Sequence, residues 1–142
     1  MKNGNGNGNF LASSVRANGA PPLSRKVWIL GSHPDRTKTA VDAIHLAGHE
    51  ARVGELGAEL APALREFKPD MIVIDMQDQP DRNRHLAVQL RADRATRQLP
   101  IILVGLQGEE AQKADRAVPG PTRRYVHSLD TPSVLNSLVV EL

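Results

Sequence analysis

The stretch KPDMIVIDMQDQP, residues 68–80, decides how the chain folds. Four apolar residues, 71–74, are followed directly by Asp75, where the apolar run ends. Because a half-buried strand alternates polar and apolar residues, a run that is apolar throughout predicts a strand covered on both faces, at the centre of a parallel sheet. Asp75 would then end the strand at the solvent edge of the sheet, where we expect its carboxylate to stay hydrated or to bond to nearby loop amides.

Around this strand the sequence alternates between strand and helix patterns. Short apolar runs predict four further strands, at 26–32, 50–56, 99–106 and, after a turn, within 119–129. The run at 50–56 is the least apolar of the first three and is expected at an edge. Helical spacing of apolar residues predicts five helices, at 34–50 (ending near Gly48), 58–68, 81–97, 107–118 and 130–142. Such alternation predicts a parallel sheet with helices on both faces, whose functional residues gather at the carboxyl ends of the strands.

Length and composition exclude several classes of protein. A chain of 142 residues suggests one domain, and the absence of Cys excludes disulfides, thiol catalysis and Cys-ligated metal sites. No run approaches the roughly 18 apolar residues of a membrane-spanning helix, and the N-terminus has no signal-peptide pattern. We therefore expect a cytoplasmic protein without a membrane partner.

The N-terminal residues differ from the rest of the chain. Residues 1–24 are rich in Asn and Gly and are predicted to be a disordered tail, so that residues 25–142 form the folded domain. The first 26 residues hold four basic residues and no acid, whereas the whole chain has a net charge of +2, so the remainder carries −2. A mildly acidic domain is not expected to bind nucleic acid.

Three stretches carry a resemblance to a known family. They are KPDMIVIDM (68–76), LRADRATRQLPIILV (90–104), which puts Pro100 25 residues after Asp75, and RRYVHSL (123–129). They resemble the third strand, the third helix with the fourth strand, and the fifth strand of the receiver domains of two-component response regulators, and the similarity extends over residues 26–142. The resemblance implies an α/β fold of the flavodoxin-like (receiver-like) type, a doubly wound five-stranded parallel sheet, (βα)5, in three α/β/α layers. It also places Asp75 where the family accepts a phosphoryl group from a histidine kinase.

The sequence departs from this family at most positions that support phosphorylation. Gly31 and Ser32 stand where an acidic pair would hold Mg²⁺, and Gly lacks a ligand while Ser is a weak one. Gly105 replaces the hydroxyl residue that ends the fourth strand. Ser128 and Leu129 replace the Lys and Pro that end the fifth. These degenerate pocket positions indicate a pseudo-receiver, in which the fold serves as a binding module.

The interpretation that follows is a single-domain, atypical receiver that is not an enzyme and acts through protein–protein interactions in bacterial signalling. Its partner would be a signalling protein such as a histidine kinase or another regulator, and a homodimer stays open. The expected surface lies on the fourth helix, fifth strand and fifth helix, with Arg123, Arg124 and Tyr125 as contact residues and an acidic partner edge. No cofactor and no metal are expected, with Mg²⁺ needed only if Asp75 is phosphorylated.

Two alternatives remain at this point. Asp75 could be a working phosphoacceptor in a phosphorelay, with Mg²⁺ held by Asp35 or by Asp78, which we place with Asp81 in one mobile loop. The chain could instead be a flavodoxin-like cofactor-binding module of the cobalamin type, although the sequence around His33 lacks that signature.

Three other groups of residues have simpler interpretations. His33 is expected to be a turn residue without a role. His45 and His49 have a metal-ligand spacing on a helix, but without an evident third ligand we expect solvated side chains. Arginines spaced by three are expected to form a solvated helix face rather than a phosphate clamp: Arg91, Arg94 and Arg97.

Overall fold

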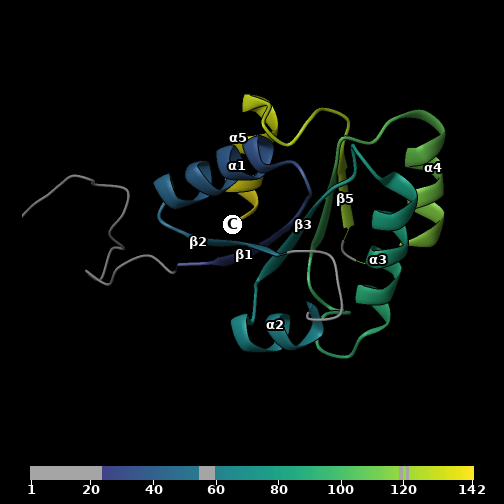
Figure 1. Ribbon diagram of the computed structural model, residues 1–142, viewed down its shortest axis with the longest axis horizontal. Coiled ribbons are helices and arrows are strands. Elements are labelled where there is room, and N and C mark those ends of the chain that lie inside the picture. Colours follow the sequence, from purple (N-terminus) through teal and green to yellow (C-terminus); the bar gives the residue numbers. More distant parts are fainter. Residues whose placement is uncertain (1–23, 55–59, 119, 121) are drawn as a thin grey trace, which may run out of the picture.

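Five strands and five helices alternate along the chain (Figure 1). The computed structural model describes residues 24–54, 60–118, 120 and 122–142. The strands are β1 (Lys26–Leu30), β2 (Glu50–Gly54), β3 (Met71–Asp75), β4 (Ile101–Val104) and β5 (Thr122–Tyr125). The helices are α1 (Pro34–Leu46), α2 (Leu60–Phe67), α3 (Pro80–Ala92), α4 (Gly108–Ala117) and α5 (Pro132–Glu141). Apart from Ser24, the predicted tail lies outside the described residues.

All five strands are parallel, in the order β2-β1-β3-β4-β5. The predicted doubly wound parallel sheet is therefore confirmed, with β3 at its centre and β2 at an edge. The register pairs Leu30 with Ile74 and Asp75 with Val104, so the carboxyl ends of β1, β3 and β4 meet at one edge. Strand β1 has β2 on one side and β3 on the other, so the order of the strands reverses at β1. The boundary between β1 and β3 is therefore the switch point, where folds of this kind bind ligands.

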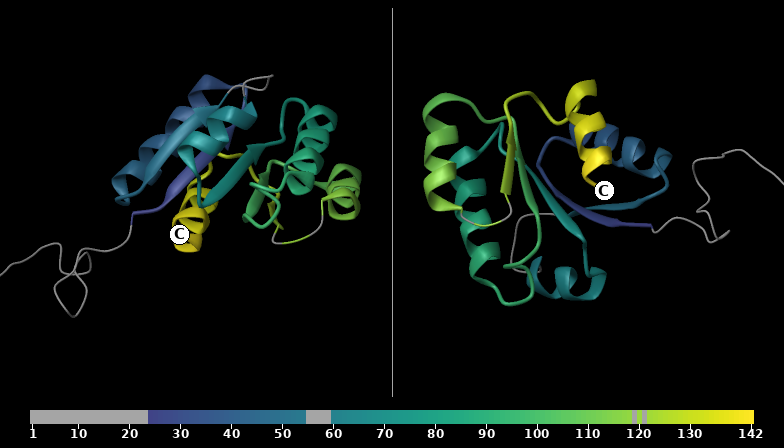
Figure 2. Two further views of the ribbon diagram at one scale, coloured as in Figure 1. Left: turned by 90° about the horizontal axis from the view of Figure 1, so that it is seen from below. Right: turned by 180° about the vertical axis from the view of Figure 1, so that it is seen from behind.

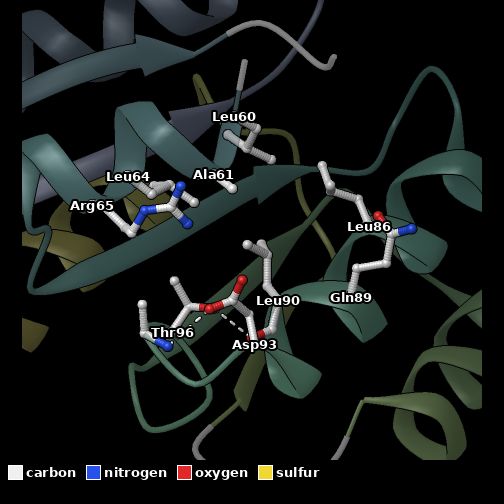
Figure 3. A pocket seen from close by; sticks show the side chains of 10 residues that line it. Leu60, Ala61, Leu64, Arg65, Leu86, Gln89, Leu90, Asp93 and Thr96 are labelled. Atoms are coloured by element: carbon white, nitrogen blue, oxygen red, sulfur yellow. Dashed lines mark hydrogen bonds between the residues drawn. The ribbon is translucent and has the colours of Figure 1, made fainter. Parts of the chain in front are cut away.

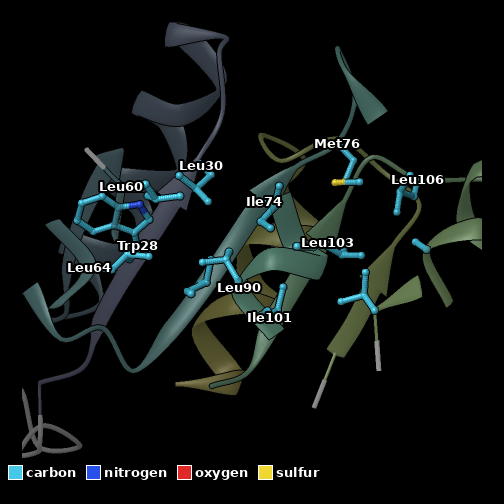
Figure 4. Packing of buried hydrophobic residues seen from close by; sticks show 14 of the residues in the cluster. Trp28, Leu30, Leu60, Leu64, Ile74, Met76, Leu90, Ile101, Leu103 and Leu106 are labelled. Carbon is cyan, nitrogen blue, oxygen red and sulfur yellow. The ribbon is translucent and has the colours of Figure 1, made fainter. Parts of the chain in front are cut away.

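Helices cover both faces of the sheet, as the continuous apolar strands predict (Figure 2). Helices α1 and α5 pack on the side chains of one set of alternate strand residues, and α2, α3 and α4 pack on the other set. On the second face Trp28 contacts Phe67 of α2, with ring centroids 5.5 Å apart (Figure 4 shows this cluster). Each fully buried aliphatic side chain contributes about 1.5–3 kcal/mol to the stability of the fold through its removal from water. The two helix layers therefore hold the strands, and with them the edge where β1, β3 and β4 end, in place.

Helix α3 ends earlier than the sequence predicts. Its last residue is Ala92, because Asp93 takes an extended backbone and its carboxylate accepts a hydrogen bond from the Ala95 amide at 2.8 Å. The expected helical face of three arginines is therefore wrong, since only Arg91 lies on α3. Its Nη1 donates to the carbonyl of Leu99 at 2.8 Å, which makes it a brace for the connection to β4.

Strand β5 is also shorter than expected and ends at Tyr125. The residues that follow form bends before α5.

Among the described residues, none of the helices combines the length and the apolar character that crossing a membrane requires.

Candidate functional site

Asp75 ends β3 at the sheet edge, but it is not the hydrated ion that the sequence suggests. It is only 3% exposed. Its Oδ2 accepts a hydrogen bond from Nε of Arg36 at 2.8 Å, and its Oδ1 accepts one from the backbone amide of Gln77 at 3.1 Å. The expected hydration is wrong because a protein cation and an amide replace water around the carboxylate, whereas the expected bond to a loop amide is present.

Arg36 comes from the first turn of α1 and is itself only 9% exposed. Its second arm also forms an ion pair, since Nη2 donates to Oδ2 of Asp78 in the loop after β3. Burial opposes the charge of Arg36, but the hydrogen bonds and charges of Asp75 and Asp78 outweigh burial and raise the pKa of the guanidinium above its ordinary value. Arg36 is thus a permanent positive charge between two carboxylates.

The loop that leaves β3 is fixed by bonds to the main chain and the side chain of Asp75 and by the ion pair of Asp78 with Arg36. Asn83, on the first turns of α3, is 4% exposed, and its Nδ2 donates to the carbonyl of Asp75 at 2.7 Å. Together with the amide of Gln77 and the Asp78 ion pair, this bond ties both ends of the loop to the same strand end. Asp81 is outside this arrangement. It was expected in the loop with Asp78, but it lies on α3 and pairs with Arg84 at 2.9 Å.

Two glycines lie at the same edge of the sheet as Asp75. Gly31 follows β1, and a Cβ added there would lie 3.2 Å from Cβ of Asp75 and 3.0 Å from Cγ2 of Thr37. Gly105 follows β4 with φ +80°, a conformation that side chains rarely adopt, and an added Cβ would lie 3.2 Å from Cβ of Gln77. At both positions a residue larger than glycine would therefore force its neighbours to shift.

Ser32 and Ser128 offer little to a ligand at Asp75. Ser32 is exposed after β1. The Oγ of Ser128 donates to Oδ1 of Asp130 at 2.7 Å, within the turn that leads to α5.

The residues present do not fit a divalent cation. Mg²⁺ needs several oxygen ligands in near-octahedral geometry, and carboxylates usually supply the charge. Here the Asp75 Oδ2 atom faces the guanidinium of Arg36, and Gly31 supplies no ligand. Asp35, a proposed ligand, is exposed on α1. Within the ranges that the structure describes, no three His, Cys, Asp or Glu residues are grouped so that they could hold a metal.

Of the three histidines that the sequence analysis considered, two accept hydrogen bonds from the main chain. His33 is the N-cap of α1, with Nδ1 accepting from the backbone amide of Arg36 at 3.4 Å. His49 accepts a hydrogen bond from the amide of Arg25 at 3.0 Å, whereas His45 lies exposed in the last turn of α1. His33 thus has a role that the sequence interpretation missed.

The predicted partner surface is divided by the alternation of β5. Arg123 pairs with Glu141 of α5 at 2.6 Å, and Arg124 pairs with Asp115 of α4 at 2.6 Å, so the two arginines lean toward opposite faces of the sheet. Tyr125 is half-buried and packs against the cluster under α1 and α5. These residues lie side by side on β5, but both arginines already have acidic partners in the chain.

A pocket of about 250 Å³ lies between α2 and α3 (Figure 3), and Asp75 is not among the residues that line it. Its floor is formed by leucines, with Arg65 and Asp93 among the lining residues. Thr96, which also lines it, uses its hydroxyl to donate to the carbonyl of Leu90. The pocket holds no pair of groups suited to catalysis among its described residues, so the strand-end cluster is the better candidate site.

Arg36 is the site residue that sequence reasoning missed. A signal was present, since SHPDRT (residues 32–37) places a basic residue in the first turn of a helix, where the helix dipole disfavours a positive charge. An arginine there, directly after a strand that ends at the functional edge, indicates a specific acidic partner.

Solved structures with the same architecture are receiver domains. The chemotaxis response regulator CheY4 of Vibrio cholerae matches with a TM-score of 0.68 and 16% identity, over 84% of this chain and 98% of that one. The CheY-like receiver domain from Methylobacillus flagellatus matches with a TM-score of 0.63, 17% identity and coverages of 84% and 98%. The BeF3-activated receiver domain of RstA from Klebsiella pneumoniae matches with a TM-score of 0.63, 16% identity and coverages of 82% and 96%.

The similarity is one of fold. No family model matches the sequence, and no curated protein matches it either. The chain has the flavodoxin-like fold of response regulator receiver domains, and the region matched covers most of the chain.

Proposed function

We propose that this chain is an atypical receiver domain that acts by binding other signalling proteins, without phosphorylation of Asp75. The observation that carries the proposal is the state of the Asp75 carboxylate, which is buried with one oxygen on Arg36 and the other on the amide of Gln77. A phosphoacceptor needs a free oxygen to attack and a cation to neutralise the phosphoryl charge. Here both carboxylate oxygens already accept hydrogen bonds, and the Arg36 cation beside them is already paired with Asp75 and Asp78.

The other strand ends support the same proposal. At Gly105 a hydroxyl side chain would need an unfavourable positive φ, and Ser128 directs its hydroxyl toward Asp130. No basic side chain among the described residues forms an ion pair with Asp75 other than Arg36. A receiver without these groups keeps the fold and its surfaces but lacks the means to sense a phosphoryl group.

The proposed partner is a signalling protein such as a histidine kinase or another regulator, and the proposed contact surface is α4, β5 and α5. In each of the ion pairs of Arg123 and Arg124 one side chain is more than half exposed and the other about a quarter to a third exposed, so the pairs cost little to rearrange. An acidic partner edge could exchange with Glu141 or Asp115 for these arginines.

An amide NMR fingerprint with Mg²⁺ and beryllofluoride, a mimic of aspartyl phosphate, tests the proposal. We expect the wild-type spectrum to stay unchanged at concentrations that saturate the receiver domain of RstA from Klebsiella pneumoniae, whose structure is BeF3-activated and which serves as the positive control. Acetyl phosphate treatment followed by intact-mass measurement should likewise add no phosphoryl group.

Shifts that cluster around Asp75, extend to Tyr125 and vanish in Asp75→Ala would contradict the proposal. They would establish the alternative, a working phosphoacceptor. A coloured purified protein with a flavin or cobalamin spectrum would contradict both in favour of a cofactor-binding module.

A further inference from the structure

We infer that Arg36 is a resident counter-cation that takes the place of a divalent metal at Asp75, so that its side chain and a metal ion exclude one another. The inference rests on the proposed function and deepens it, because it names the group that holds the site in one state. It concerns a contact built into the fold, between the first turn of α1 and the end of β3.

The two arms of the guanidinium give Arg36 the reach of a bridging cation. Nε donates to Oδ2 of Asp75 at 2.8 Å, while Nη2 pairs with Oδ2 of Asp78. The Asp75 side chain is 2% exposed and that of Arg36 is 10% exposed, whereas that of Asp78 is 43% exposed. The guanidinium therefore links a buried strand end to a partly solvated loop, as a metal ion shared by two carboxylates would.

The energetics show that this contact is specific. A positive charge in the first turn of a helix is opposed by the helix dipole, and removing a guanidinium from water is costly. A surface-oriented arginine at this position would avoid the cost of removal from water. Arg36 accepts both costs because two carboxylates compensate its charge, so its inward orientation follows from the acids.

The position of the guanidinium also opposes a metal ion at Asp75. A metal ion bound to Oδ2 needs the position that the Nε proton occupies, at a ligand distance of about 2.0–2.1 Å for Mg²⁺. Repulsion between a dication and a guanidinium held beside it would oppose simultaneous occupancy.

The contact also fixes the loop without any ligand. Gln77 and Asn83 bond to Asp75, and Asp78 pairs with Arg36, which is itself bonded to Asp75. These three contacts of the loop therefore all lead to the end of β3. The β3–α3 connection therefore has a single arrangement that does not depend on a metal.

Titration with MnCl2, a paramagnetic analogue of Mg²⁺, tests the inference on the full chain. We expect amide signals of Asp75, Gln77 and Asp78 to broaden in Arg36→Ala at Mn²⁺ concentrations at least tenfold below those that affect the wild type. Asp75→Asn added to Arg36→Ala should abolish this binding. Arg36→Lys keeps a positive charge and should exclude Mn²⁺ as the wild type does.

Arg84→Ala is the matched control, because Arg84 also bridges two acids, Asp81 and Glu110, away from Asp75. It should leave the signals around Asp75 unbroadened. If Arg36→Ala unfolds, Mn²⁺ should restore its fold; an Arg36→Ala protein that stays unfolded in Mn²⁺, or stays folded without binding it, contradicts the inference.

Equal Mn²⁺ affinity in the wild type and Arg36→Ala would also contradict it. These outcomes are separate from the proposed function, because beryllofluoride is tested on the wild type alone. A wild type that takes up neither beryllofluoride nor Mn²⁺, with an Arg36→Ala variant that also ignores Mn²⁺, would overturn the counter-cation and leave the binding module in place.

Discussion

Neutralising Asp75 should destabilise this protein, and the sign of that effect is informative. In a site built from several carboxylates, replacing one with an amide relieves repulsion and tends to stabilise the fold. Here Asp75 faces Arg36 at 2.8 Å in a buried position. We therefore expect Asp75→Asn, which keeps the shape of the side chain, to lower the free energy of unfolding.

The magnitude follows from the surroundings of the pair. Removing one partner of a buried ion pair costs about 3–5 kcal/mol, because the other charge stays buried without compensation. Arg36 would keep its ion pair with Asp78, whose side chain is 43% exposed, so part of the compensation survives. We expect a loss of about 2–3 kcal/mol, at or just below the low end of the cost of breaking a buried pair.

Urea unfolding followed by fluorescence measures this loss, since Trp28 is the single tryptophan and is buried against Phe67. With an m value of about 1.5–2 kcal/mol/M, the urea midpoint should fall by about 1–2 M while m stays unchanged. Asp42→Asn is the matched control, because it removes a carboxylate from an exposed pair with Lys38 on the same helix as Arg36. Its midpoint should stay close to that of the wild type.

An Asp75→Asn midpoint equal to or above that of the wild type would refute the reasoning. It would mean that the carboxylate is either hydrated or repelled by its neighbours in solution, and that Arg36 points elsewhere. A loss of the same size in Asp42→Asn would show that net charge, rather than the buried pair, governs stability.

Three further predictions follow from the packing, the backbone and the charge of the site. Leu90→Ala should cost about 2–5 kcal/mol in urea unfolding, because Leu90 is 5% exposed in the cluster under α2, α3 and α4. Gly105→Ala should destabilise by about 2 kcal/mol or more and Gly48→Ala by only about 1 kcal/mol, because both have positive φ but an added Cβ is crowded at Gly105 alone; equal losses would contradict the crowding. The raised pKa of Arg36 contributes stability that is fully present below the pKa of arginine in the unfolded chain and is lost only above the pKa of Arg36 in the folded protein. The difference in urea midpoint between wild type and Arg36→Ala should therefore be constant from about pH 6 to about pH 9.

The fold could be predicted well because its signals are local. Continuous apolar residues in β3 and β4 require cover on both faces, and the structure buries every one of them. The less apolar run of β2 lies at the sheet edge, as expected. Element ends were less predictable, since α3 stops at Asp93 through a side-chain bond to the backbone of Ala95.

The candidate site could be predicted only in part. Strand ends placed Asp75, Gly31 and Gly105 at one edge, and the register confirms that arrangement for β1, β3 and β4. The expected hydration of Asp75 was wrong, and the arginines of β5 proved to be paired within the chain. A sequence pattern states which residue ends a strand but not what faces it across the sheet edge.

By itself, the sequence determined the order of strands and helices, the two buried faces of the central strands and the presence of Gly31 and Ser32, rather than acidic residues, directly after the first strand. Only the tertiary structure decided the state of Asp75. Arg36 lies 39 positions away along the chain, and it reaches Asp75 because the pairing of β1 with β3 brings the first turn of α1 beside the end of β3. A charge balance of this kind depends on distances between separate elements, which local propensity and periodicity do not specify.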